Sequence, residues 1–164
     1  MSQVLPEQGI REEPAAAVRA WARLLRAYAL TTRRLSAQLQ AEHGLTINDY
    51  EALLQLSRSE GGRMKRVELA RGLLLTPSGV TRLLEGLERA GLVERATCPT
   101  DLRVAYAQLT DEGRERVAAA SCAHVGSVRA LFGEHLSANQ IDELADLLGR
   151  LPGVAEGDDG CTVD

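Results

Sequence analysis

The sequence predicts a mainly α fold with one small β-hairpin, and three observations lead to this prediction. The 164 residues are 45% hydrophobic but include only one Trp, three Tyr and one Phe, so the core must consist mainly of Leu, Ala and Val. Such a core favours helices over a β-sandwich. Apolar residues recur at helical spacing over most of the chain, and only residues 92–109 change to short β-like runs. A domain of this length buries enough surface to fold without metal or disulfide support.

The charge distribution leaves a nucleic-acid partner open although the net charge is −4. Residues 1–13 hold one arginine against three glutamates, and residues 152–164 hold four acids and no base. We predict that both tails are disordered. The part between them is slightly basic, because eight basic residues fall between 63 and 103, namely Arg63, Lys65, Arg66, Arg71, Arg82, Arg89, Arg95 and Arg103.

The sequence lacks the signals expected of several other classes of protein. Cys98, Cys122 and Cys161 are odd in number and irregularly spaced, which indicates neither a disulfide framework nor a zinc site. The chain has no signal region and no apolar run of about 18 residues, so we expect a cytoplasmic protein without membrane contact. It has no phosphate loop, nucleophile elbow or metal-protease motif, so we expect no enzyme and no cofactor. Cys122 is predicted to be buried, and His124 and His135 to be surface or helix-end residues.

The first long helix is expected from Pro14, which suits a helix start, to Gly44, which suits a helix end. One apolar stripe runs along it and consists of Val18, Trp21, Leu24, Leu25, Tyr28, Leu35 and Leu39. A helix of this length with one apolar stripe usually needs a partner.

Two shorter helices follow. Thr46 and Asp49 form a capping-box pattern for a helix over residues 47–58, which ends before the glycine pair at 61–62. A brief extended segment then leads to a helix over Val67–Leu73, without a Ser or Thr in the capping position.

The next helix is the best defined in the sequence. Thr76 is a good N-cap, Pro77 suits the first helical position, and Gly91 ends the helix. A tight turn around residues 74–76 separates it from the preceding helix. Its inner face is apolar and consists of Val80, Leu83, Leu84, Leu87 and Ala90.

The period changes after Gly91. "LVER" and "RVAYAQL" are short β-like runs, and the turn-rich link "ATCPTDL" joins them into a predicted hairpin. Helical spacing resumes after Thr110, a capping residue, and continues to about Phe132. A last helix is predicted over Ser137–Leu151, and its buried residues are expected to be Ile141, Leu144, Leu147 and Leu148.

This order of elements is that of a winged helix-turn-helix flanked by long helices. In that fold the second helix enters the major groove of DNA and the hairpin reaches an adjacent minor groove. The outer face of the helix after Thr76 shows Ser78, Thr81 and Arg82, and acids appear only in its later turns. Small hydroxyl residues permit close approach to DNA, and an arginine can read a guanine. A plain solvated face explains this pattern equally well by itself, but the hairpin that follows favours the DNA-binding interpretation.

The segment Glu68–Gly113 resembles the DNA-binding core of the MarR family of bacterial transcription regulators. Five ordered motifs carry the resemblance, and the flanking helices extend it to about residues 15–151. The motifs are "LA" at Leu69-Ala70, "VTR" at Val80–Arg82, "RAGLVER" within Leu87–Arg95, "D-x-R" at Asp101–Arg103 and "LT-x-x-G" at Leu109–Gly113.

The resemblance implies roles for residues of the recognition helix. Thr76 and Pro77 would start this helix, and Ser78, Thr81 and Arg82 would lie on its groove-facing side.

It also implies roles in the wing. Arg103 would reach the minor groove, and Asp101 would pair with Arg103 and hold its guanidinium in position. The second wing arginine common in the family is Leu102 here, and Val104 follows Arg103 where small residues are common, so we expect fewer wing contacts. Arg95 is a candidate phosphate contact.

The resemblance implies the following organisation. Residues 14–45 and 110–151 would form a helical dimerisation region, and residues 46–109 the DNA-binding region, between the tails 1–13 and 152–164. An obligate homodimer would read a pseudopalindromic operator in double-stranded DNA.

The function implied is that of a ligand-responsive repressor of its own or a neighbouring promoter. A small aromatic or phenolic effector would release the DNA. Trp21, His43, Asn48 and Tyr50 lie on segments that could line its pocket, although packing or capping accounts for them as well.

Two alternatives remain open. A redox-responsive regulator would use Cys98, because Arg95 and Arg103 give this cysteine a positive setting. A dimerisation or anti-repressor protein that does not bind DNA is the other alternative, and the presence of Arg82 and of the Asp101 and Arg103 pair argues against it.

Overall fold

The computed structural model describes residues 13–97 and 104–154. The chain divides into two compact units, residues 1–34 and residues 35–164, and each is described by itself. The two tails predicted to be disordered lie outside the described residues except at their inner ends, so their disorder stays a prediction.

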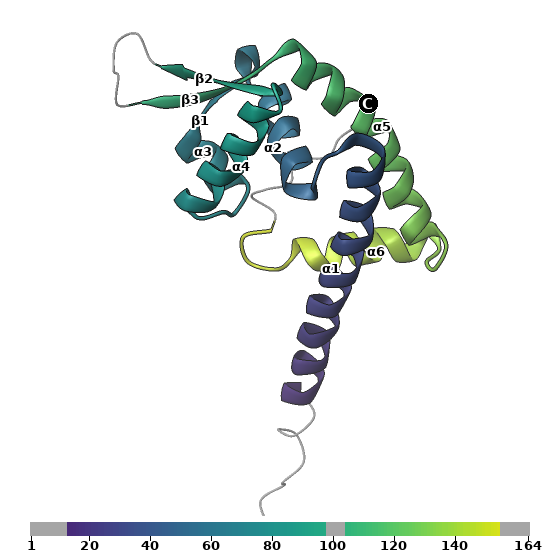
Figure 1. The fold of residues 1–164 in the computed structure, drawn as a ribbon. Coiled ribbons are helices and arrows are strands. Elements are labelled where there is room, and N and C mark those ends of the chain that lie inside the picture. Colours follow the sequence, from purple (N-terminus) through teal and green to yellow (C-terminus); the bar gives the residue numbers. More distant parts are fainter. Residues whose placement is uncertain (1–12, 98–103, 155–164) are drawn as a thin grey trace, which may run out of the picture. The chain divides into compact units, whose positions relative to one another are not determined.

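Helix α1 (Glu13–His43) begins one residue before the predicted start and ends before Gly44, whose φ is 69° (Figure 1). Over residues 13–34 most of its large apolar side chains are exposed, with exposed fractions of 65% for Val18, 61% for Trp21 and 69% for Tyr28, while Leu24 is half-buried. The apolar stripe predicted for this segment is therefore not buried by the described residues.

Helix α2 (Ile47–Arg58) lies at the centre of the core. The predicted capping box is confirmed, because Asp49 N donates to Thr46 Oγ1 (3.2 Å) and Thr46 N donates to Asp49 Oδ2 (2.9 Å). Leu53 and Leu56 of α2 have no exposed surface. Burial of each such leucine contributes about 1.5–3 kcal/mol relative to an exposed one.

A small antiparallel sheet follows α2, after a single helical turn at η1 (Glu60–Gly62). The predicted hairpin is confirmed as β2 (Val93–Thr97) and β3 (Ala105–Leu109). The segment predicted to be extended before α3 forms β1 (Arg63–Lys65), which pairs with β3 and gives the strand order β1-β3-β2. Val93 pairs with Leu109 and both are buried, so this face of the sheet packs on the core.

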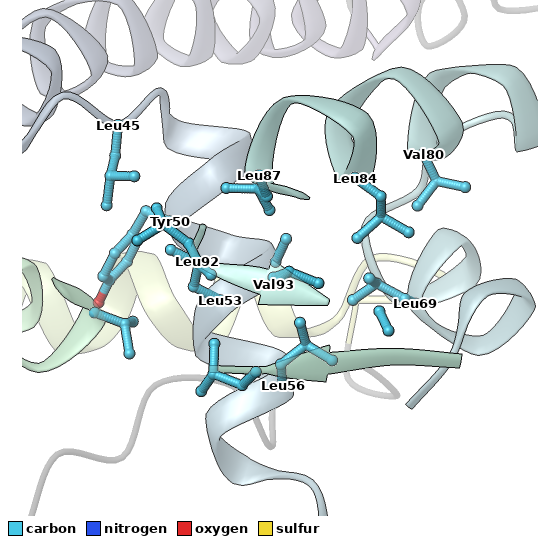
Figure 2. Packing of buried hydrophobic residues seen from close by; sticks show 14 of the residues in the cluster. Leu45, Tyr50, Leu53, Leu56, Leu69, Val80, Leu84, Leu87, Leu92 and Val93 are labelled. Atoms are coloured by element: carbon cyan, nitrogen blue, oxygen red, sulfur yellow. The ribbon is translucent and has the colours of Figure 1, made fainter. Parts of the chain in front are cut away.

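Helices α3 (Arg66–Gly72) and α4 (Pro77–Arg89) form the helix-turn-helix. The predicted cap of α4 is confirmed, since Gly79 N donates to Thr76 Oγ1 at 3.1 Å. In Figure 2, Val80 and Leu84 of α4 point toward Leu69 of α3, and the three side chains are at most 4% exposed. The fold class predicted from the sequence is thus confirmed.

Helix α5 (Asp111–Gly133) begins after the predicted cap Thr110, whose hydroxyl accepts from Gly113 N at 3.0 Å. It packs on α2 through the buried residues Val117 and Ala120. Gly113 allows the first turn of α5 to lie close to the Leu92 carbonyl, because a Cβ atom there would collide with it.

Helix α6 (Ala138–Gly149) has no buried residue, so the predicted burial of its leucines and isoleucine is wrong for the single chain. Leu147 is 52% exposed and Ile141, Leu144 and Leu148 are only partly covered. The predicted helix is confirmed, but the described residues of the chain do not bury its apolar face.

Candidate nucleic-acid interface

The N-terminal end of α4 presents three hydroxyl groups, in its cap and its first two turns. Thr76 Oγ1 accepts from Gly79 N and lies 3.2 Å from Ser78 Oγ, while Thr81 Oγ1 donates to the Pro77 carbonyl at 2.8 Å. Thr76 and Ser78 are exposed, and Thr81 is half-buried. Because the Thr81 proton is engaged by its own helix, Thr81 can accept a hydrogen bond from a ligand but not donate one while that bond persists.

The first turn of α4 favours an anion. It contains no acidic residue, although the first turn of a helix is where Asp and Glu are stabilised by the macrodipole. Pro77 has no N–H group and the Gly79 N–H is engaged by the cap, so this helix end offers a phosphate the Ser78 N–H and small side chains.

Arg82 lies one turn after Ser78 and is exposed. It forms no ion pair with any described residue. Its guanidinium is therefore available to an external acceptor, and its planar donor fork suits a guanine edge or a phosphate.

The sheet carries Arg95 on β2. Arg95 pairs with the buried residue Ala107 and lies on the same sheet face as Val93, but its side chain is exposed because β2 is an edge strand. Cys98, Asp101 and Arg103 lie outside the described residues, so the wing contacts and the pairing of Asp101 with Arg103 stay predictions.

Sequence reasoning assigned no role to a second basic site on the sheet. The Arg63 guanidinium stacks on the Tyr106 ring, 4.1 Å from its centroid, and Lys65 pairs with Glu68 at 3.2 Å. The signal was present in the alternation of exposed Arg63 and Lys65 with half-buried Met64, which places both bases on the outer face of the sheet. Stacking fixes the orientation of the arginine at the cost of its rotamer freedom.

The turn between α3 and α4 holds a residue that sequence reasoning also missed. Leu74 has a φ of 53° and an exposed fraction of 93%. The left-handed conformation costs an L-residue about 1–2 kcal/mol, and glycine avoids this cost. The run of three leucines before the Thr76 cap was the available signal, because such a turn usually contains glycine.

Tyr50 and His124 form a contact between α2 and α5. Tyr50 is 5% exposed, its hydroxyl donates to Ser121 Oγ at 3.3 Å, and its ring centroid lies 4.7 Å from that of His124. The prediction of a surface or helix-end position for His124 is wrong, because the ring is half-buried and its Nδ1 atom is buried without a hydrogen-bond partner. This burial lowers the pKa of His124 below its ordinary value.

The other candidate effector residues are placed apart. The His43 side chain is 17% exposed and lines a polar hollow with Glu42, Glu112, Glu115, Arg116 and Ala119, whereas Asn48 is exposed at the start of α2. Trp21 belongs to residues 1–34, the unit described by itself. The structure does not bring His43, Asn48 and Tyr50 together around that hollow, so an effector role for each stays a prediction.

The cysteine prediction on α5 needs a correction. Cys122 is exposed rather than buried, because it lies on the solvent side of the helix whose opposite side carries Val117 and Ala120.

Two further findings concern residues 13–97 and 104–154. These ranges contain no group of three or more His, Cys, Asp or Glu side chains that could hold a metal ion. None of their helices combines the length and the hydropathy that a membrane span needs.

Comparison with known proteins extends these observations. A family model described as the MarR family matches residues 43–103. The chain is 32% identical over 113 residues to the uncharacterized HTH-type transcriptional regulator YhbI of Bacillus subtilis (strain 168), a match that covers 69% of this chain and 71% of that protein. It is 31% identical over 111 residues to the HTH-type transcriptional repressor YetL of the same organism, with 68% and 66% covered. The crystal structure of Sco3205, a MarR family transcriptional regulator from Streptomyces coelicolor in complex with DNA, is 33% identical, with a TM-score of 0.75 over 84% of this chain and 88% of that chain.

Proposed function

The chain belongs to the MarR family of transcriptional regulators, and we propose that it binds double-stranded DNA in a sequence-specific way through α4 and the β2–β3 hairpin. The observation that carries the proposal is the first turn of α4, which is exposed, free of acids and followed by the exposed guanidinium of Arg82. The similarity to Sco3205, which was solved in complex with DNA, supports it.

Within this interface we assign separate roles to the side chains. Thr76, Pro77 and Ser78 form the helix end that approaches a phosphate, with the Ser78 N–H and hydroxyl as donors. Thr81 accepts from a base edge or a water molecule, and Arg82 reads a guanine.

On the wing, Arg95 contacts a phosphate and Arg103 enters the minor groove. Asp101 orients the Arg103 guanidinium, so its loss weakens binding even though a carboxylate repels phosphate. The exposure of Arg95 supports the first of these roles.

We propose further that the protein acts as a homodimer. Large exposed apolar side chains on α1 and α6, among them Trp21, Tyr28 and Leu147, support this assembly, because such patches mark interaction surfaces. Two-fold symmetry would then require a pseudopalindromic operator with half-sites about one helical turn apart.

The proposed regulatory role is repression of its own or a neighbouring promoter, relieved by a small aromatic or phenolic effector. Similarity to the repressor YetL supports repression. An effector acts only if it binds the DNA-incompetent state more tightly than the competent one. The candidate contacts are Trp21, His43, Asn48 and Tyr50, and oxidation of Cys98 is the alternative signal.

The DNA-binding proposal is tested by selecting duplexes from a random-sequence library with the wild-type chain. Arg82→Ala should lower the preference for the selected duplex over random duplex by about 5- to 150-fold, the range for one lost bidentate base contact. Arg89→Ala removes the same charge from the last turn of α4 and is the matched control. Failure to enrich any duplex at low salt would overturn the proposal, and equal loss on selected and random DNA would make Arg82 a phosphate contact.

The regulatory proposal is tested by titrating the complex between the protein and its selected duplex with phenolic compounds, urate and peroxide. Release by a phenol or urate supports the effector mechanism. Release by peroxide alone, abolished in Cys98→Ser, would replace it with the redox alternative.

A further inference from the structure

We propose that Leu74, in the turn between α3 and α4, makes an apolar contact with a thymine C5-methyl group in the major groove and so contributes to operator choice. This inference rests on the DNA-binding function proposed above. The starting observation is that Leu74 has a left-handed backbone conformation and an exposed side chain, and that nothing in the fold of the free chain requires either.

Helices α3 and α4 end in the same hydrogen-bonded motif. After α3, Leu74 N donates to Arg71 O (3.2 Å) and Leu75 N to Ala70 O (3.0 Å). After α4, Gly91 N donates to Glu88 O (3.1 Å) and Leu92 N to Leu87 O (3.0 Å). Both pairs are the two bonds of a Schellman motif, whose left-handed residue is usually glycine.

The two motifs differ at that left-handed residue. Gly91 occupies it after α4, with a φ of 74°, whereas Leu74 occupies it after α3, with a φ of 53°. The other described residues with positive φ are also glycines, at positions 44, 61, 62 and 153. Leu74 is therefore the exception among matched positions of the described chain.

Packing within the chain does not account for the exception. Leu74 is 93% exposed, so its side chain gains almost nothing from the core, and both motif bonds use backbone atoms that glycine also has. The residue thus combines unfavourable backbone geometry with an exposed apolar side chain. Such a residue indicates a function outside the folding of the chain.

The position of Leu74 indicates which partner covers it. It lies two residues before Thr76, the N-cap of α4, and the N-terminal end of the second helix is the part of a helix-turn-helix that approaches base edges. Figure 1 shows the α3–α4 turn leading directly into this end of α4. The thymine methyl is the apolar group that bases present in the major groove, and aliphatic side chains pair with it.

The experiment is a double-mutant cycle on protein and DNA. The duplex selected with the wild-type chain is resynthesised with each dT replaced singly by dU, which removes only the methyl group. For the wild type we expect about a fourfold loss at one position in each half-site, the factor that corresponds to one buried methyl group. In Leu74→Gly the dU substitution at that position should have no effect, while sensitivity elsewhere is unchanged.

Two further variants complete the test. Leu74→Met keeps an apolar side chain and should keep the sensitivity to dU, whereas Leu74→Asn, which tolerates the left-handed conformation, should lose it. Val67→Ala is the matched control, because Val67 is also exposed (70%) but lies at the opposite end of α3. The Tm of Leu74→Gly and Leu74→Asn should not be lower than that of the wild type, which excludes misfolding as the cause.

Each remaining outcome contradicts the proposal. If Leu74→Gly keeps the wild-type response to every dU substitution, Leu74 does not contact a thymine methyl. If it weakens binding equally on all duplexes, Leu74 contacts deoxyribose and carries no sequence information. If the wild type distinguishes no duplex from random DNA, the proposed function fails and this inference with it, whereas the first two results leave the proposed function intact.

Discussion

Helices α4 and α6 have nearly the same length and the same kind of apolar stripe, yet the chain buries one and not the other. Helix α4 buries Val80, Leu84 and Leu87 against its own chain. Helix α6 buries no residue, and its Leu147 is 52% exposed. Periodicity therefore predicts that a helix has an apolar face, but not whether the same chain covers that face.

The first half of α1 resembles α6 in this respect. Trp21 and Tyr28 are more than half exposed, although they belong to a regular helical stripe. Substitutions around α2 and α4 should therefore change the free energy of unfolding of the single chain. Substitutions on α1 and α6 should instead change the stability of the proposed dimer. Substitutions in α4 and α6 test this division.

The largest effect is expected in the α4 core. Leu84→Ala should lower the free energy of unfolding by about 2–5 kcal/mol, because it leaves a cavity among buried side chains. The matched substitution Leu147→Ala on α6 should change it by about 0.5 kcal/mol or less at protein concentrations where the chain is monomeric. Urea denaturation measures both, and equal losses would contradict the contrast between the two helices.

For self-association, the larger effect is expected on α6. Leu147→Glu should weaken self-association by about tenfold or more, since it places a charge in a surface proposed to become buried. Sedimentation velocity over a concentration series measures the effect, and Glu143→Gln on the same helix is the control. An unchanged association constant in Leu147→Glu would remove α6 from the dimer interface.

The cap of α4 should give a smaller effect. Thr76→Ala removes the acceptor for Gly79 N and should lower the free energy of unfolding by about 1 kcal/mol. Thr76→Ser keeps the hydroxyl and should keep most of the free energy of unfolding that Thr76→Ala loses. If Thr76→Ala is as stable as the wild type, the cap bond is not formed in solution.

The smallest effect concerns pH and compares His124 with His135. Burial lowers the pKa of His124 in the folded state. As the pH falls, the unfolded state therefore binds the proton at about pH 6.5, before the folded state does. Stability is therefore complete above about pH 6.5 and falls as the pH drops toward the folded pKa.

His124→Phe should reduce the loss of Tm between about pH 7.5 and about pH 5.5 relative to the wild type. The ring contact with Tyr50 makes Phe the suitable replacement. His135→Phe changes an exposed residue and should behave as the wild type does. An identical pH dependence in His124→Phe would show that His124 is not desolvated in solution.

Local signals predicted the elements well. The caps at Thr46, Thr76 and Thr110 are formed as expected, because each depends only on residues within one turn. The pairing of β1 with β3 could not be predicted, since it joins segments some 40 residues apart and β1 is only three residues long. The capping box of Ser137 and Gln140 is likewise local, because Ser137 N donates to the Gln140 side chain three residues later.

The candidate site was predicted in part. Ser78 and Arg82 are exposed on α4 as the helical period requires, but the stacking of Arg63 on Tyr106 depends on strand register. Leu74 was missed because a left-handed conformation at leucine contradicts residue preference, and His124 because burial there comes from the packing of α5 on α2.

Trp21 has a practical consequence for experiments. It is the single tryptophan of the chain, it lies on α1, and its indole is mostly exposed. Intrinsic tryptophan fluorescence therefore comes from one known place, far in sequence from α4. An indole emits at shorter wavelength when its surroundings become apolar, so a blue shift on concentrating the protein would report the covering of α1 without any label. The same signal offers a direct readout of whether DNA or a small molecule changes that part of the helix.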